Sequence, residues 1–92
     1  MTSAPPIAAL ASPRRRELLR LCWREPRTAG ELHRALGDVT FGAVSQHLKL
    51  LADAGLVECT RDGRHRHYRA RRAAVGPLRR WLVRMKNAAL TY

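Results

Sequence analysis

Residues 40–55 read T-F-G-A-V-S-Q-H-L-K-L-L-A-D-A-G, and this stretch decides how the chain folds. Placed on a helix, its apolar residues recur every three or four positions and form one stripe. That stripe is Phe41, Val44, Leu48, Leu51 and Ala52. The opposite stripe is thin and polar, and it comprises Gly42, Gln46, Lys49 and Asp53. Such a helix can bury one face and lay the start of its other face close against another surface.

The preceding residues predict a shorter helix joined to this one by a tight turn. Thr28 is a candidate N-cap, and Glu31, three residues later, completes a capping box. Gly37 is placed to end this helix, and Thr40 can cap the next one after a turn of about three residues. Two helices with this spacing over residues 28–55 indicate a helix-turn-helix.

A β-hairpin is predicted directly after Gly55. Residues 56–61 and 64–70 alternate as two strands do, and Asp62-Gly63 between them is a strong hairpin signal. Val57 and Cys59 share one face of the first strand. A hairpin after a helix-turn-helix, here over residues 56–70, is a wing.

The two ends of the chain are predicted to be helical. Residues 1–11 form an arm with a short helix, and a second helix is capped by Ser12 and ended by Pro26. The last helix, over residues 72–89, has apolar residues at heptad-like spacing. The expected dimer interface comprises Ile7, Leu10, Val75, Leu78, Trp81, Leu82, Met85 and Ala89. The alternative is that the apolar seam of the last helix, formed by the residues at heptad-like spacing, packs on the chain's own core.

Composition narrows the class of protein. Ninety-two residues make one domain, and a net charge of +11 with a pI near 11.5 favours a polyanionic partner, nucleic acid rather than a membrane. We expect a cytoplasmic protein, because the chain has neither an apolar run of about 20 residues nor a signal peptide. Two cysteines make no disulfide framework. No constellation of catalytic residues is found, so an enzyme is not expected.

Three motifs, in this order, resemble the ArsR/SmtB family of winged-helix repressors. They are V-S-Q-H-L-K-L-L at residues 44–51, A-G-L-V at 54–57, and the hairpin from Asp62-Gly63-Arg64 to Tyr68-Arg69. The resemblance covers about residues 10–85. It implies a mainly α winged helix-turn-helix (α-α-α-α-β-β-α) that dimerises through its terminal helices and binds operator DNA, usually as a repressor.

The start of the helix at residues 40–55 is predicted to enter the major groove. Gln46 is the best candidate for reading a base, since its amide can pair bidentately with adenine. Phe41 either packs in the core, which its angle favours, or meets a thymine methyl. The predicted DNA-binding residues are Thr40, Gly42, Ala43, Ser45, Gln46, His47 and Lys49 on the helix, with Arg64, His65 and Arg66 on the wing. For each wing arginine, and for residues 14–16, a solvated surface charge is the alternative.

Two metal sites known in the family lack their ligands in this sequence. The Cys-x-Cys pair of one site falls on Thr28 and Gly30, and no Asp, Glu or His follows Tyr68 to form the other. We therefore predict no metal or other cofactor, and the effector is unknown. A repressor that responds to thiol oxidation or to an atypically bound metal through Cys22 or Cys59 is the alternative; a buried, inert cysteine is favoured at both positions.

Overall fold

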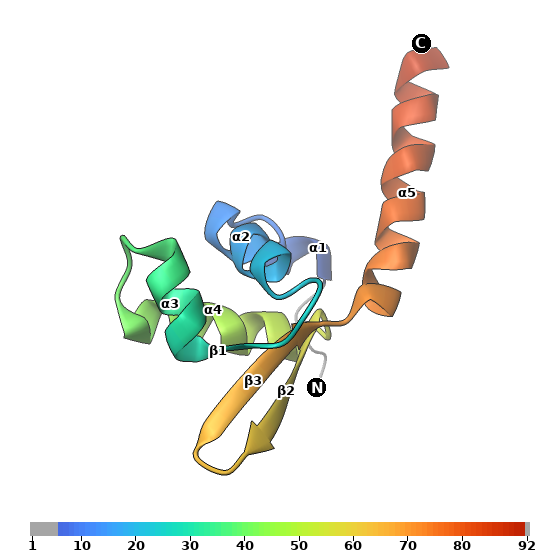
Figure 1. Cartoon of the computed structure of the whole chain (residues 1–92). Helices are drawn as coiled ribbons and strands as arrows, with labels where there is room; N and C mark the ends of the chain where they lie inside the picture. The colour runs from blue at the N-terminus through green and yellow to red at the C-terminus, as the bar shows by residue number, and fades with distance from the viewer. Residues whose placement is uncertain (1–5, 92) are drawn as a thin grey trace.

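The computed structural model describes the backbone of residues 6–91 and the side chains of residues 7–80, 83 and 84. Its elements are α1 (Pro6–Ala9), α2 (Pro13–Leu21), β1 (Arg27–Thr28), α3 (Ala29–Leu36), α4 (Phe41–Asp53), β2 (Val57–Asp62), β3 (His65–Ala70) and α5 (Arg72–Thr91). Helices α1–α4 gather together, the β2–β3 hairpin projects from them, and α5 leaves on another side (Figure 1). This is the winged helix-turn-helix that the sequence predicts.

The predicted N-caps are confirmed for α2, α3 and α4. The Ser12 hydroxyl accepts from the backbone N–H of Arg15, at 3.3 Å. Thr28 and Glu31 form the full capping box, with bonds of 3.1 and 2.8 Å. The Thr40 hydroxyl accepts from the backbone N–H of Ala43, at 3.1 Å, and so starts α4 where the sequence places it.

The end of α2 differs from the prediction, because this helix stops at Leu21, before Pro26 can act on it. In a longer helix the Cys22 carbonyl would accept from residue 26, but proline has no N–H to donate. That carbonyl instead accepts from the backbone N–H of Ala70, at 3.0 Å. At the end of α2, a tertiary hydrogen bond from the end of β3 therefore replaces the next hydrogen bond of the helix.

The sheet has three antiparallel strands in the order β1-β3-β2, one strand more than the predicted hairpin. The extra strand, β1, pairs Arg27 with Tyr68 and Thr28 with His67. Two residues are too few to show strand alternation, so the sequence alone carried no signal for it. This strand connects the start of the helix-turn-helix to the wing.

The hairpin turn is also shifted by one residue from the prediction. Asp62 pairs with His65, so the two loop residues are Gly63 and Arg64, not Asp62 and Gly63. Gly63 has a φ of 61°, as the first loop residue of a type II′ turn requires, and glycine adopts it without steric cost. The shift leaves Arg64 at the tip of the wing.

The core lies between α2, α3, α4 and the base of the wing. Its fully buried side chains are Leu18, Cys22, Leu32, Val44, Leu48, Leu51 and Leu56. Three of these, Val44, Leu48 and Leu51, come from the apolar stripe of α4, as predicted. Two expectations are wrong: Phe41 is 51% exposed, and Cys59 is exposed. Both lie beyond the edge of the core, Phe41 at the start of α4 and Cys59 where β2 leaves Val57.

The described contacts between the last helix and the core lie at the beginning of the helix. Ala74 and Val75 contact the core, whereas Val83 is 48% exposed. The molecule measures 52 × 28 × 27 Å along its principal axes, and the protruding helix contributes to the longest of these dimensions (Figure 1). Of the expected interface, Ile7 is exposed, and Leu10, Val75 and Leu78 are half-buried. The side chains of Trp81, Leu82, Met85 and Ala89 lie outside the described residues. Within the described chain, no helix combines the length and apolarity that crossing a bilayer requires.

Candidate nucleic-acid interface

The polar stripe of α4 faces solvent beside the wing. Gly42, Gln46, Lys49 and Asp53 are all exposed. The first three of these residues line a groove, together with Ser45. The other wall of this groove is formed by Cys59, Arg66 and Tyr68 of the wing. A Cβ added at Gly42 would meet nothing closer than the Thr40 hydroxyl, at 4.0 Å, so the backbone there is open to a close approach. The face predicted to read DNA is therefore free of the chain's own contacts at its start.

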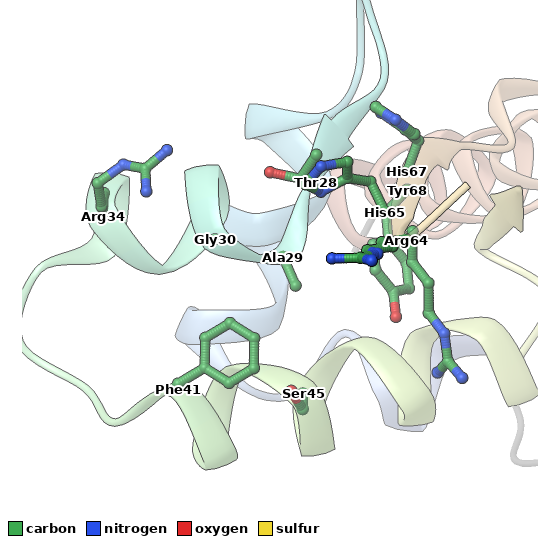
Figure 2. Close-up of a pocket in the computed structure, with 11 residues that line it drawn as sticks. Thr28, Ala29, Gly30, Arg34, Phe41, Ser45, Arg64, His65, His67 and Tyr68 are labelled. Atoms are coloured by element: carbon green, nitrogen blue, oxygen red, sulfur yellow. The ribbon is translucent and has the colours of Figure 1, made fainter. Parts of the chain in front are cut away.

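A second groove, of about 580 Å³, runs between the start of α3, the start of α4 and β3 (Figure 2). Its lining comprises Thr28, Ala29, Gly30, Arg34, Phe41, Ser45, Arg64, His65, Arg66, His67 and Tyr68. Three of these residues are arginines: Arg34 lies on α3, and Arg64 and Arg66 lie on the wing. Arg34 was not predicted from the sequence, because only the tertiary structure brings α3 against the wing.

The two faces of the wing differ in charge. On the face toward α4, Arg61 lies directly opposite Arg66, and both are exposed. Like charges at directly opposed positions destabilise a strand pair. On the other face, Glu58 lies opposite Arg69, and Asp62 lies opposite His65. A bound anion would relieve the repulsion on the first face. Arg61 is therefore a candidate residue, one that was not predicted from the sequence.

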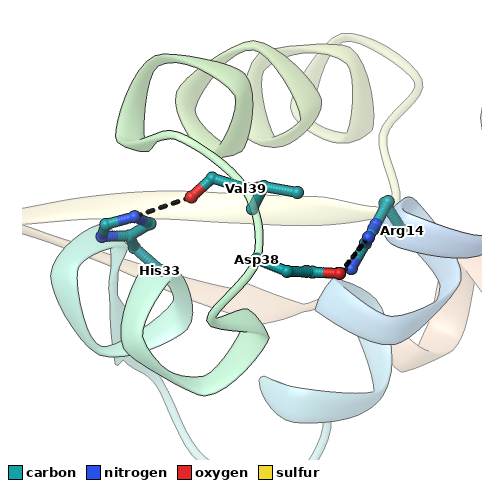
Figure 3. A network of polar contacts seen from close by, with 4 residues as sticks. All are labelled: Arg14, His33, Asp38 and Val39. Atoms are coloured by element: carbon teal, nitrogen blue, oxygen red, sulfur yellow. Dashed lines mark hydrogen bonds and ion pairs between the residues drawn. The ribbon is translucent and has the colours of Figure 1, made fainter.

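The turn between α3 and α4 is held from both sides (Figure 3). The Nε2–H of His33 donates to the Val39 carbonyl, at 2.9 Å. The guanidinium of Arg14 donates to both carboxylate oxygens of Asp38, each at 2.5 Å. This pairing lowers the pKa of Asp38 and raises the pKa of Arg14. Residues from α2 and α3 thus set the angle at which α4 begins.

The arginines of α2 make internal contacts, a role that their sequence did not predict. Besides Arg14, Arg15 donates from Nε to the Ala9 carbonyl, at 2.5 Å, and Arg16 donates to the Leu10 carbonyl, at 2.7 Å. Ala9 is the last residue of α1, and Leu10 follows it directly. These charges join α1 to α2 across their connecting turn.

His47 lies on the flank of α4 that faces α2. Its Nδ1 is 3.3 Å from Nη1 of Arg15, a group that can only donate, so this contact suits a neutral ring with Nδ1 accepting. Burial, followed by the charges of Arg15 and Arg14, lowers the pKa of His47. Of the predicted DNA-binding residues on α4, His47 and Ala43 are half-buried, and the others are exposed.

The two thiols lie in different environments. Cys22 has no exposed surface, and burial raises the pKa of its thiol. Cys59 is exposed on β2, opposite Tyr68. Partial burial, with a smaller effect of Cys59, raises the pKa of Tyr68. Among the described residues, no group of three or more His, Cys, Asp or Glu side chains is placed to hold a metal ion.

Comparison with known proteins places these elements in a wider group. A helix-turn-helix domain model matches residues 10–60. A solved structure of a possible transcriptional regulator for arsenical resistance shares 33% identity and a TM-score of 0.80, over 89% of this chain and 84% of its own. An ArsR-like transcriptional regulator from Rhodococcus sp. RHA1 shares 33% identity and a TM-score of 0.77, over 89% and 74%.

A third solved structure is described as homodimeric. It is the winged helix-turn-helix DNA-binding domain of a possible ArsR-family regulator from Mycobacterium bovis. It shares 29% identity and a TM-score of 0.71, over 87% of this chain and 73% of its own. Among proteins with curated functions, none matches the chain.

Proposed function

This chain belongs to the ArsR/SmtB family of winged helix-turn-helix regulators, and from that premise we propose that it is a homodimeric repressor that binds an inverted-repeat operator. That it is a DNA-binding transcriptional regulator of ArsR type follows from the family itself. Repression, the dimer and the operator symmetry are the proposal. The observation that carries it is the exposed start of α4, beside a groove lined by arginines.

In the proposed complex, the start of α4 lies in the major groove. The Gln46 amide is exposed there and can accept from and donate to adenine, which discriminates this base by about 1–3 kcal/mol. Ser45 and Thr40 can bond to a base or to a phosphate, although the Thr40 hydroxyl already accepts a helix N–H. Gly42 and Ala43 permit close approach, and Lys49 meets a phosphate.

The wing supplies phosphate contacts beside this helix. Arg64 at its tip, His65 and Arg66 reach the DNA backbone or the minor groove. To these contacts we add Arg61, which lies opposite Arg66, and Arg34 of α3, which lines the same groove as Arg64 and Arg66. A phosphate between Arg61 and Arg66 would neutralise a pair of charges that repel each other in the free protein. His47 has the weakest case, since its ring already contacts α2.

A second copy of the chain is proposed to cover α5. Its apolar seam continues beyond Val75, which is the last residue with a described contact to the chain's own core, and the Mycobacterium bovis relative is a homodimer. Ile7 and Leu10 of the N-terminal region join the expected interface. Two copies related by a twofold axis present two α4 helices, so half-sites about one helical turn apart are expected.

The proposal includes no metal effector. At the positions of the family's Cys-x-Cys pair, this chain has Gly30, which offers no ligand, and Thr28, whose hydroxyl is engaged in the capping box. For the thiol-responsive alternative, Cys22 is a poor candidate because its raised pKa disfavours the thiolate, which leaves Cys59. Operator binding before and after oxidation, with Cys59→Ser as the control, tests it; a response that this variant abolishes would replace the plain repressor.

Selection of bound sequences from random double-stranded DNA tests the function. We expect an inverted repeat whose affinity falls steeply with salt, because several phosphates are neutralised. Recovery of no common sequence, or binding that does not change with salt, would overturn the proposed operator. Expression of a reporter gene behind the selected sequence then distinguishes repression, in which adding the protein lowers expression, from activation.

A further inference from the structure

Phe41 is a large apolar side chain at the exposed start of α4. It is the first residue after the Thr40 cap, and 51% of its surface is exposed. Its ring does not join Val44 and Leu48 in the core but lines the arginine-rich groove, close to Ser45 on the next turn (Figure 2). A partner that covered the exposed part of this ring would remove apolar surface from water and so gain binding free energy.

The ring of Phe41 is held in place before any partner binds. The His33 ring meets it edge to face, with a centroid separation of 5.7 Å and an interplanar angle of 86°. His33 is itself fixed by its hydrogen bond to the Val39 carbonyl, at 2.9 Å. A side chain that is already ordered loses little rotamer freedom on binding, so its contact is available for affinity and discrimination.

The surroundings of Phe41 indicate the chemistry of the partner. Arg34, Arg64 and Arg66 line the same groove and suit phosphates. A strand whose phosphates meet these arginines presents its base edges to the start of α4, where Phe41 and Ser45 lie. In the major groove, the apolar group on a base edge is the C5-methyl of thymine.

We propose that Phe41 is a specificity-determining residue that packs on a pyrimidine C5-methyl group in each half-site of the operator, with thymine as the ordinary source. The inference rests on the proposed function, since it requires α4 to read the major groove. It adds a second reader to Gln46, one that senses a methyl group where Gln46 senses hydrogen-bonding edges.

The test uses the full chain and the sequence obtained by selection. Each thymine is replaced singly by deoxyuridine, and at the sensitive position cytosine and 5-methylcytosine are also compared. We expect one position per half-site where loss of the methyl weakens binding about fourfold, from the transfer free energy of one methyl group. At that position, 5-methylcytosine should bind more tightly than cytosine by a similar factor.

Phe41→Ala should bind thymine and uracil at this position equally, and Phe41→Gln provides a second variant should the first fail to fold. Gln46→Ala is the matched control, and it should retain the preference for the methyl group. If the wild-type protein is indifferent to every methyl group, or if Phe41→Ala retains the preference or weakens binding to all sequences alike, the role of Phe41 is wrong. If the wild-type protein selects no sequence at all, the proposed function itself fails, and this inference fails with it.

Discussion

Helices α4 and α5 are both amphipathic, but the chain secures them in different ways. The start of α4 is capped by Thr40, and the preceding turn is held by Arg14 and His33. Val44, Leu48 and Leu51 on the core side of α4 are fully buried. On α5, the described contacts with the core are those of Ala74 and Val75 near its beginning. The position of α4 is thus determined by contacts within its own chain, as a DNA-reading helix requires. For α5, the proposed function assigns the cover of its apolar face to a second copy of the chain.

The largest effect expected from this difference is on stability. Leu48→Ala leaves a cavity in the core under α4 and should lower the free energy of unfolding by about 2–5 kcal/mol. Val83→Ala removes an exposed side chain of α5 and should change it by less than about 0.5 kcal/mol. Urea unfolding followed by circular dichroism measures both, and comparable losses would contradict the contrast between the two helices.

The second expected effect is on assembly. Leu78→Glu places a charge on the seam of α5 and should give monomers in sedimentation, with operator binding weakened at least about tenfold because the two half-sites are then bound separately. Val83→Glu makes the same chemical change elsewhere on the helix, off the seam, and should remain dimeric. A dimeric Leu78→Glu variant would mean that the seam packs only on the chain's own core.

Sequence discrimination by α4 should change by a smaller amount. Gln46→Ala is expected to relax the preference at one operator position by about 1–3 kcal/mol. Lys49→Ala should weaken binding to all sequences alike and reduce the salt slope by about one. Competition binding with single-base operator variants separates the two patterns, and unchanged discrimination in Gln46→Ala would remove this residue as a base reader.

The smallest expected effect concerns pH and the contact between α4 and α2. Because the pKa of His47 is lowered in the folded protein, the unfolded chain binds its proton first as the pH falls below about 6.5. Stability should therefore decrease from about pH 6.5 downward, through the lowered pKa. His47→Gln should reduce this decrease, measured by thermal unfolding at pH 7.5 and 5.5. Equal pH dependence in wild type and His47→Gln would exclude this linkage.

Local residue chemistry was sufficient to predict most elements. The caps at Ser12, Thr28 and Thr40 depend on hydroxyls that accept from backbone N–H groups three residues later. Such local caps can be predicted from the sequence. The buried stripe of α4 follows from helical periodicity in the same way. Strand β1 was missed because its existence depends on partners forty residues away, Tyr68 and His67.

The exposed face of α4 was predicted, but its neighbours were not. The angle of Phe41 on the helix favoured the core, and its exposure became evident only from where the core ends. Arg34 and Arg61 join the candidate site through the packing of α3 on the wing and the register of the hairpin. For the arginines at 14–16, the sequence left DNA contact and surface charge as alternatives, and the structure adds their contacts with α1 and with the turn before α4.

The amino-acid sequence was enough to predict the order of the helices and the hairpin, the face of α4 that is buried and the strongly basic character of the chain. Each of these depends on periodicity, on caps within one turn or on composition. Packing between distant segments was needed to show which arginines make internal contacts, that Arg61 lies opposite Arg66 on the wing, and that the ring of Phe41 is exposed. Those outcomes depend on strand register and on the limits of a small core, and both are set by contacts between residues far apart in the chain.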